Sequence, residues 1–326
     1  MSTHWISRRA ALAGLAGFIS TELAAQPMAA ATNLRTLISP FSPGSSSDVL
    51  ARKLGGAVAT RSNGVISVEN HPGASGLLAV QQLLKLPRNG EAVLLANSGL
   101  VCNTPLLVKS PKGNNPQLDL VPVCIVAGAP FFLFANRQFS SGTLAELQSS
   151  HKDAAAGLTY AANDPGSANH VAGEVILRRL SIRGIHVPYK NSIQGVIDVV
   201  EGRVQVGVFG WQNISSFVKA GSLKVLALLA NERLKVAPDI ATVRGQGFGD
   251  FRIKGWHGLF AAREIPETSL QALDRLMHAV LRDYEMKQFI ADIGFAPDYR
   301  GLADATEFVS AEIQKYRDLF QELKIP

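Results

Sequence analysis

The clearest strand-to-helix junction in this chain is Leu37-Ile38-Ser39-Pro40-Phe41-Ser42-Pro43-Gly44-Ser45-Ser46-Ser47-Asp48. A short apolar strand runs into a turn of Pro and Gly, and three serines then precede apolar residues at helical spacing from Val49 onward. Unpaired N–H groups and the helix dipole make a helix N-terminus attractive to anions. Serine in front of a helix is equally a common cap of that helix. The junction therefore has two open interpretations, capping alone or anion binding.

The rest of the chain alternates strand-like and helix-like stretches, a pattern typical of α/β proteins. Near the start, three strands are each followed by a loop of Gly, Ser, Asn and Pro, and in a parallel sheet such loops emerge at the ligand-binding edge. The long apolar run Val121–Phe134, broken by Gly128 and Pro130, is predicted to pass between two lobes. Further strands are predicted at Val65–Glu69, Ala92–Ala96, Leu158–Ala161, Ile185–Val187, Val204–Phe209, Leu223–Leu229 and Trp256–Ala261, and helices at Leu77–Leu86, His170–Leu180, Ile193–Glu201, Pro266–Leu281, Tyr284–Ile293 and Ala305–Leu323.

Length and composition fit two packed domains and argue against disorder. The chain has 326 residues, of which 47% are apolar and 18% charged. Its net charge of +6 is not the footprint of a nucleic-acid binder, because the Lys and Arg residues are scattered and are not interleaved with aromatic residues. We expect no nucleic-acid partner. If the loop-bearing edges of the two lobes face each other, helix N-termini, hydroxyls and amides line a cleft suited to a small carboxylate.

The first 31 residues have the pattern of an export signal peptide. Arg8-Arg9 precede an apolar run from Ala10 to Ile19, and the small residues Ala29-Ala30-Ala31 follow. The paired arginines favour a twin-arginine signal, with ordinary secretion as the open alternative. We expect a soluble periplasmic protein that begins near Thr32, with no later segment long and apolar enough to cross a membrane.

The two cysteines are expected to be unpaired. Cys102 and Cys124 both lie beside apolar residues, which favours buried thiols over a disulfide even in an oxidising compartment.

Motifs of catalysis and metal binding are missing from the sequence. G-x-S-x-G, the P-loop and H-E-x-x-H are absent, and Gly245-Gln246-Gly247-Phe248-Gly249 fails G-x-G-x-x-G by one residue. Asp48, Asp164 and Glu174 lie at turns or helix starts, where capping is the ordinary role. We therefore expect no catalytic residue, metal or cofactor. His170 has two open interpretations, a ligand donor in the cleft or a residue at the edge of the core.

An ordered set of motifs resembles one family, the tripartite tricarboxylate transporter receptors, also called Bug receptors. Each motif is weak alone, but together they follow the family's order along almost the whole mature chain. They are Pro40-Phe41-Ser42-Pro43-Gly44 with Asp48, Val68-Glu69-Asn70-His71-Pro72-Gly73-Ala74, Asn169-His170-Val171-Ala172-Gly173-Glu174, Val187-Pro188-Tyr189-Lys190, Val218-Lys219-Ala220-Gly221-Ser222-Leu223-Lys224-Val225-Leu226-Ala227, Pro238-Asp239-Ile240-Ala241-Thr242-Val243 and Trp256-His257-Gly258-Leu259.

The resemblance implies a periplasmic binding protein of the type II, Venus-flytrap kind. Each of its two α/β lobes is expected to hold a mainly parallel sheet flanked by helices. Residues 32–129 with 252–326 form lobe 1 in this prediction, and residues 130–251 form lobe 2. By position, the ligand-binding residues are predicted to be Phe41, Ser42, Gly44, Ser45, Ser46, Asn97, Ser98, Ser167, Asn169, His170 and Gly210.

The sequence departs from the family pattern at two places. The family commonly has two glycines where this chain has Gly44-Ser45, and it often has Asp where this chain has Gly210. Loss of that acid argues against an amine-bearing ligand. Trp211 either lines the cleft for a flat acid or packs beneath its own helix.

The predicted function is a monomeric receptor that captures a small carboxylate for the permease subunits of a tripartite transporter. Two alternatives remain open. One is an exported α/β enzyme that acts on a carboxylate, and the other is a sensing subunit that docks to a signalling protein.

Overall fold

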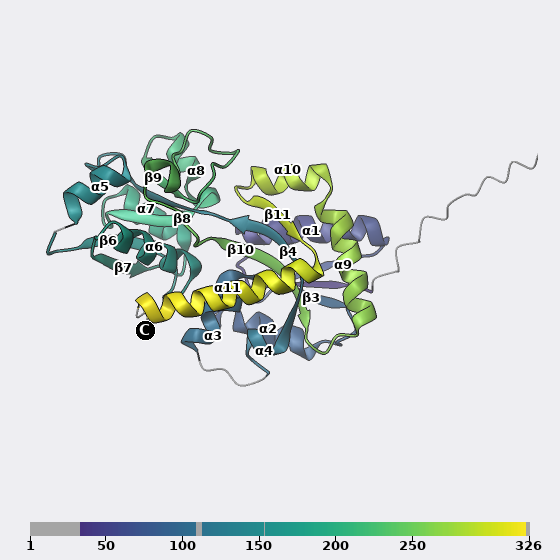
Figure 1. Ribbon diagram of the computed structural model, residues 1–326. Coiled ribbons are helices and arrows are strands. Elements are labelled where there is room, and N and C mark those ends of the chain that lie inside the picture. The colour runs from purple at the N-terminus through teal and green to yellow at the C-terminus, as the bar shows by residue number, and fades with distance from the viewer. Residues whose placement is uncertain (1–32, 109–112, 153, 324–326) are drawn as a thin grey trace, which may run out of the picture.

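The structure is a computed structural model that describes residues 33–108, 113–152 and 154–323. The predicted signal peptide lies outside these residues. Figure 1 shows two α/β lobes side by side, each built around one sheet. This arrangement confirms the predicted two-lobed fold.

Lobe 1 is built on a sheet whose described strands lie in the order β11-β4-β10-β3-β1-β2. Strands β1, β2 and β3 are parallel, while β10 runs antiparallel to both β3 and β4, and β11 antiparallel to β4. The sheet is therefore mixed, with four of its six described strands in one direction. Its strands are β1 (Thr36–Ser39), β2 (Ser67–Asn70), β3 (Ala92–Asn97), β4 (Leu120–Ala129), β10 (Gly255–Ala262) and β11 (Ala296–Arg300).

Lobe 2 is built on a sheet with the described order β7-β6-β8-β5-β9. Strands β6, β7 and β8 are parallel, and β5 runs antiparallel to both β8 and β9. Only β5 runs against the other four described strands. These strands are β5 (Phe131–Asn136), β6 (Leu158–Ala162), β7 (Gly184–Pro188), β8 (Val206–Gly210) and β9 (Leu223–Leu229).

Helices cover both faces of each sheet, and their bounds follow the predicted ranges to within a few residues. The sequence patterns did not predict β11 or the short helices after β3, because these segments have no clear periodicity. The helices are α1 (Ser46–Ser62), η1 (Ala74–Gly76), α2 (Leu77–Lys85), η2 (Gly99–Asn103), α3 (Thr104–Leu107), α4 (Pro116–Asp119), α5 (Leu144–His151), α6 (Ala168–Arg179), α7 (Ser192–Val200), α8 (Trp211–Lys219), η3 (Arg244–Gln246), α9 (Glu267–Leu281), α10 (Tyr284–Asp292) and α11 (Leu302–Leu323). None of the helices in the described ranges is long and apolar enough to span a membrane.

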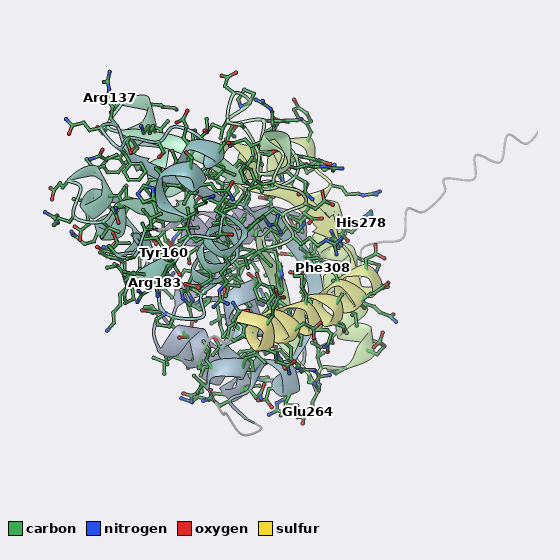
Figure 2. The ribbon with its side chains drawn as sticks, turned by 60° about the vertical axis from the view of Figure 1, so that its left-hand side comes forward. Arg137, Tyr160, Arg183, Glu264, His278 and Phe308 are labelled. Carbon is green, nitrogen blue, oxygen red and sulfur yellow. The ribbon has the colours of Figure 1, made fainter. Side chains whose placement is uncertain are left out.

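One hydrophobic cluster continues from lobe 1 into lobe 2. It joins Ile38 and Leu94 of the first sheet to Leu133 and Tyr160 of the second. Figure 2 labels Tyr160 in lobe 2 and Phe308, on α11, in lobe 1. A second cluster lies on the opposite face of the first sheet, beneath α1, α9 and α10, and a third lies beneath α7 and α8. The lobes are therefore packed against each other through a shared apolar interior.

The cysteines belong to different faces of the first sheet. Cys102 lies in the cluster shared by both lobes, and Cys124 lies in the cluster beneath α1. Both thiols are buried and free, as the sequence predicts.

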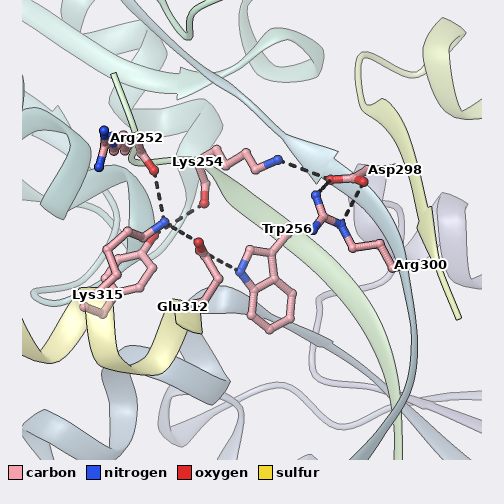
Figure 3. A network of polar contacts seen from close by, with 8 residues as sticks. Arg252, Lys254, Trp256, Asp298, Arg300, Glu312 and Lys315 are labelled. Carbon is pink, nitrogen blue, oxygen red and sulfur yellow. Dashed lines mark hydrogen bonds and ion pairs between the residues drawn. The ribbon is translucent and has the colours of Figure 1, made fainter. Parts of the chain in front are cut away.

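The chain crosses between the lobes at Pro130, between β4 and β5, and again in residues 230–254, between β9 and β10. The long helix α11 holds the end of the second crossing. Lys315 Nζ donates to the Arg252 carbonyl at 3.0 Å and pairs with Glu312, and Glu312 accepts from Trp256 Nε1 at 3.1 Å (Figure 3). This network connects the helix to the point where the chain enters β10.

Candidate functional site

The loop after β1 folds back on the first turn of α1. Ser45 is the N-cap of that helix, and its Oγ accepts from the Asp48 N–H at 3.3 Å. Its own N–H donates to the Ser42 carbonyl at 3.2 Å, which closes the turn around Gly44. Gly44 has φ +78°, a left-handed conformation that glycine adopts without strain. The capping interpretation is thus confirmed for Ser45, and capping uses only this one of the three serines.

The Asp48 carboxylate organises the same loop from beneath. One oxygen accepts from the Gly44 N–H at 2.8 Å and from Arg52 Nε at 3.0 Å, and the other accepts from Asn70 Nδ2 at 2.7 Å. Asn70 Nδ2 also donates to the Phe41 carbonyl at 3.0 Å. Burial acts to raise the pKa of Asp48, but the hydrogen bonds from Asn70, Gly44 and Arg52 outweigh it and lower the pKa. Asp48 therefore stays ionised and holds the loops after β1 and β2 together.

Ser46 and Ser47 are the two serines of this loop that do not cap α1. The Ser46 hydroxyl makes no hydrogen bond to any residue that the structure describes, and the same holds for the backbone N–H groups of Ser46 and Ser47. Ser47 Oγ lies 2.9 Å from His257 Nε2 of β10. Two N–H groups and two hydroxyls at the positive end of a 17-residue helix form a set of donors for an anion.

His257 is almost fully enclosed beneath this helix terminus. It is 5% exposed, and its ring lies between Phe41 and Phe295, with ring centroids 5.4 and 4.9 Å away. Burial lowers the pKa of His257 to about 4, so the ring is neutral near pH 7. Its Nδ1 is buried and has no hydrogen-bond partner among the described residues.

In lobe 2, the loop after β6 caps α6 in the same manner. Ser167 is the N-cap, and its Oγ accepts from the His170 N–H at 3.4 Å and donates to Asn169 Oδ1 at 2.8 Å. Asn169 is 3% exposed, and its amide donates to Asn163 Oδ1 at 3.1 Å and to the Val208 carbonyl at 2.9 Å. Ser167 and Asn169 therefore fix the loop to the end of β8.

His170 lies inside lobe 2 and supports the same loop. Its Nδ1 accepts from the Gly166 N–H at 2.9 Å. The ring packs at a tilt against His186 and stacks on Tyr160, with centroids 4.1 and 6.3 Å away. The residue is 6% exposed. Burial, and then the neighbouring His186, lower the pKa of His170 to about 3, so it carries no charge for a ligand at neutral pH. Both sequence interpretations placed it at this helix start, and its packing is that of a core-edge residue.

The N-terminus of α8 has no side-chain cap. Gly210 is the N-cap residue, and the Gln212 amide folds back over it, so a Cβ at Gly210 would lie 2.6 Å from the Gln212 amide atoms. Gln212 Oε1 is buried and has no partner among the described residues. Trp211 is 9% exposed and packs 5.2 Å from Phe132, as the packing interpretation predicts. The amide of Gln212 thus occupies the space beside Gly210 where an acid is common in the family.

One hydrogen bond and two close approaches of glycine backbone join the lobes around these loops. Asn103 Nδ2 of η2 donates to the Gly166 carbonyl at 2.6 Å. A Cβ built on Gly99 would lie 3.9 Å from the Ala168 N–H nitrogen, at the start of α6. A Cβ on Gly294, just before β11, would lie 3.0 Å from Trp211 Cβ, at the start of α8. The N-termini of α6 and α8 therefore both face lobe 1 at very short range.

The predicted residues do not all point to one place. Phe41, Ser42, Gly44, Ser45 and Ser46 form the loop at α1, and Asn97 Oδ1 accepts from the Leu100 N–H at 2.9 Å to start η2. Ser98 is 1% exposed, and its buried hydroxyl has no hydrogen-bond partner among the described residues. The sequence patterns did not reveal Ser47 with His257, Gln212 or Gly294, because each partner comes from a distant part of the chain.

The described residues contain no group of His, Cys, Asp and Glu side chains able to hold a metal ion. Ser47 and His257 have the spacing of a nucleophile and its base, but catalytic pairs of this kind need a third group to orient the base. His257 Nδ1 has no such acid within the described part of the chain. The arrangement is therefore suited to donating hydrogen bonds, and among the described residues His257 has no acid to orient it.

The chain belongs to a family of receptors. The family model for the tripartite tricarboxylate transporter family receptor matches residues 50–325. Members of the family are periplasmic binding proteins, and they are receptors for solutes.

Individual relatives agree with this assignment. The chain is 26% identical to Protein BugT of Bordetella pertussis over 314 residues, which are 95% of this chain and 96% of the relative. Among solved structures, it is similar to MatC from Rhodopseudomonas palustris with bound malate, at 27% identity and a TM-score of 0.74, covering 88% of this chain and 98% of that one. The R. palustris protein Rpa4515 with adipate has the same fold, with a TM-score of 0.81 at 24% identity, covering 90% and 97%.

Proposed function

We propose that this protein is a receptor that captures a small carboxylate between its lobes and delivers it to the permease of a tripartite transporter. The observation that carries the proposal is the N-terminus of α1, where Ser46 and Ser47 present donors that capping leaves unused. Closure of lobe 2 over a bound anion would remove water and strengthen these hydrogen bonds. The ligand would then stabilise the closed state through its greater affinity for it.

The predicted site residues take two kinds of role in this proposal. Ser46, at the end of the loop from Phe41 to Ser45, contacts the carboxylate, and Gly210 borders the ligand at the start of α8, beside the Gln212 amide. Ser42 and Gly44 shape the loop through their turn. The remaining predicted residues shape the loops after β3 and β6, and they are Asn97, Ser98, Ser167, Asn169 and His170.

The first ligand class to test is the four-carbon dicarboxylates. MatC, with 27% identity, is described with bound malate. In this proposal the second carboxylate binds at the N-terminus of α8, which has no side-chain cap, and the Gln212 amide beside Gly210 moves to admit it.

The proposal also covers export of the protein, removal of its signal peptide and the boundaries of its lobes. Residues 1–31 direct export, by the twin-arginine route, and are removed in the periplasm. Residues 32–129 with 252–326 form lobe 1, and residues 130–251 form lobe 2. The receptor works as a monomer and meets the permease in the membrane.

The test is isothermal titration calorimetry of the purified protein, after a thermal-shift screen of mono-, di- and tricarboxylates. For the ligand found, Ser46→Ala should weaken binding about tenfold or more, since a hydrogen bond to a charged group contributes about 1.5–3 kcal/mol. Ser310→Ala is the matched control, because Ser310 is an exposed α11 serine whose hydroxyl donates within its own helix. The proposal fails if no carboxylate raises the melting temperature, or if Ser46→Ala binds as the wild type does.

A second variant tests the ligand class. Gly210→Asp displaces the Gln212 amide and places a carboxylate at the start of α8, where Asp is a good helix cap. We expect affinity for a dicarboxylate to fall by tenfold or more through like-charge repulsion, and affinity for an amine-bearing acid to rise.

Chromatography of the ligand after incubation with the protein tests the alternative that the protein is an enzyme. Any product formed from the ligand would be evidence for that alternative.

A further inference from the structure

Ser47 and His257 come from segments 210 residues apart and meet at the start of α1. Ser47 lies on the same helix face as Leu50, Ala51 and Leu54, which are buried against the first sheet. Its side chain therefore points toward β10, and Ser47 itself belongs to the first turn of α1, whose N–H groups are free. Ser47 is only partly buried, whereas His257 is 5% exposed.

The surroundings of His257 limit how its proton is placed. The ring is enclosed by Phe41 and Phe295, and its Nδ1 has no polar partner in the described chain. Because burial keeps the ring neutral, one nitrogen carries a proton and the other has a lone pair. If Nδ1 carried the proton, a buried N–H would have no acceptor. If Nε2 carries it, the N–H donates to Ser47 Oγ across the observed 2.9 Å.

The second arrangement is the more stable one, because buried N–H groups without an acceptor are rarer in proteins than acceptors without a donor. It also decides what Ser47 can do. An Oγ that already accepts from His257 turns its own proton away from the ring, and that proton is then available to an anion at the start of α1. In the other tautomer, the Ser47 proton would be used up on Nε2.

We propose that His257 is a positioning residue that holds the Ser47 hydroxyl as a hydrogen-bond donor to the carboxylate of the ligand. The inference rests on the proposed function and adds to it a residue that lies beneath the site. His257 acts through Ser47, and its ring contributes no charge to the ligand.

The first experiment is a double-mutant cycle, measured as ligand affinity by calorimetry. His257→Phe keeps an aromatic ring between Phe41 and Phe295 but removes both nitrogens. We expect it to weaken binding about three- to tenfold in the wild type and less than twofold in Ser47→Ala, which itself weakens binding about tenfold. His257→Gln, whose amide N–H reaches Ser47 Oγ, should restore most of the affinity. His278→Gln, at an exposed histidine of α9, is the matched control.

The cycle separates a positioning role from mere support of the fold. A loss that is equally large with and without the Ser47 hydroxyl would overturn the proposal. Circular dichroism and urea unfolding show whether His257→Phe is folded. If it is not, the measurement of the His257 tautomer by NMR decides the matter instead.

The second experiment reads the proton directly. Nitrogen-15 NMR of the imidazole rings, assigned with the His257→Gln variant, should show His257 protonated at Nε2 and bare at Nδ1 at neutral pH, with and without ligand. An Nδ1–H tautomer would refute the inference even if the protein binds a carboxylate well. Failure of the wild type to bind any carboxylate would refute the proposed function instead, whichever tautomer the ring has.

Discussion

Replacing Asp48 by Asn tests whether the carboxylate beneath the α1 loop holds the loop together. The Asp48 side chain is 3% exposed and accepts from Gly44 N–H, Arg52 Nε and Asn70 Nδ2. The amide keeps one acceptor for Asn70 and turns an NH2 group toward Gly44 and Arg52. The lost charged bond to Gly44 costs about 1.5–3 kcal/mol. The bond to Arg52, whose side chain is 53% exposed, adds only about 0.5 kcal/mol.

The free energy of unfolding at pH 7 should therefore fall by about 2–3.5 kcal/mol in Asp48→Asn, measured by urea denaturation. The difference should depend on pH. Because the folded-state pKa of Asp48 is lowered, its contribution is fully present above the unfolded value of about 3.8 and is lost as pH falls through the folded pKa. The gap between wild type and variant should shrink below about pH 4.

Arg52→Gln is the control, since it removes the exposed partner and leaves the carboxylate bonded to Gly44 and Asn70. It should cost less than about 1 kcal/mol. The free energy of unfolding of Asp48→Asn could instead fall by less than about 0.5 kcal/mol, or by no more than that of Arg52→Gln. Either result would show that the three hydrogen bonds do not stabilise this loop as argued.

Two further predictions concern the lobe junction and the thiols. Gly294→Ala places a Cβ about 3.0 Å from Trp211, at a residue with φ +85°, and should weaken ligand binding by hindering closure of the lobes. Gly56→Ala is the control: its Cβ would have nothing within 4 Å, so this variant should bind normally and be slightly more stable. Equal affinities of the two variants in calorimetry would contradict this prediction. Burial raises the pKa of both Cys102 and Cys124, so neither should react with an aromatic disulfide reagent until urea unfolds the protein; fast labelling of the folded protein would contradict the predicted burial.

Much of the fold follows from local sequence. Apolar spacing locates most strands and helices, and the loops of Gly, Ser and Asn after strands mark the sheet edges at which we propose that the ligand binds. The Ser45 cap is likewise a local feature, since its partner lies three residues away. The family follows from motifs spread along the chain, and the match over residues 50–325 agrees with it.

The directions of side chains in the site depend on contacts between distant segments. His170 stands at a helix start, as expected, yet its ring turns inward, where it stacks on Tyr160 and packs at a tilt against His186. Likewise, the sequence shows that Gly210 stands where the family often has an acid, but only the structure shows that the Gln212 amide fills the space beside it.

The pairing of Ser47 with His257 shows the physical reason most clearly. Helix and strand formation depend on the hydrogen bonds and side-chain spacing of neighbouring residues, which can be read along the chain. The 2.9 Å contact depends instead on the position of β10 between β3 and β4, where the register shifts between His257 and Gly258. A change of register by one residue would turn the histidine to the opposite face of the sheet. The donors of the α1 terminus are therefore a local property, whereas the orientation of the Ser47 hydroxyl arises from packing across the sheet.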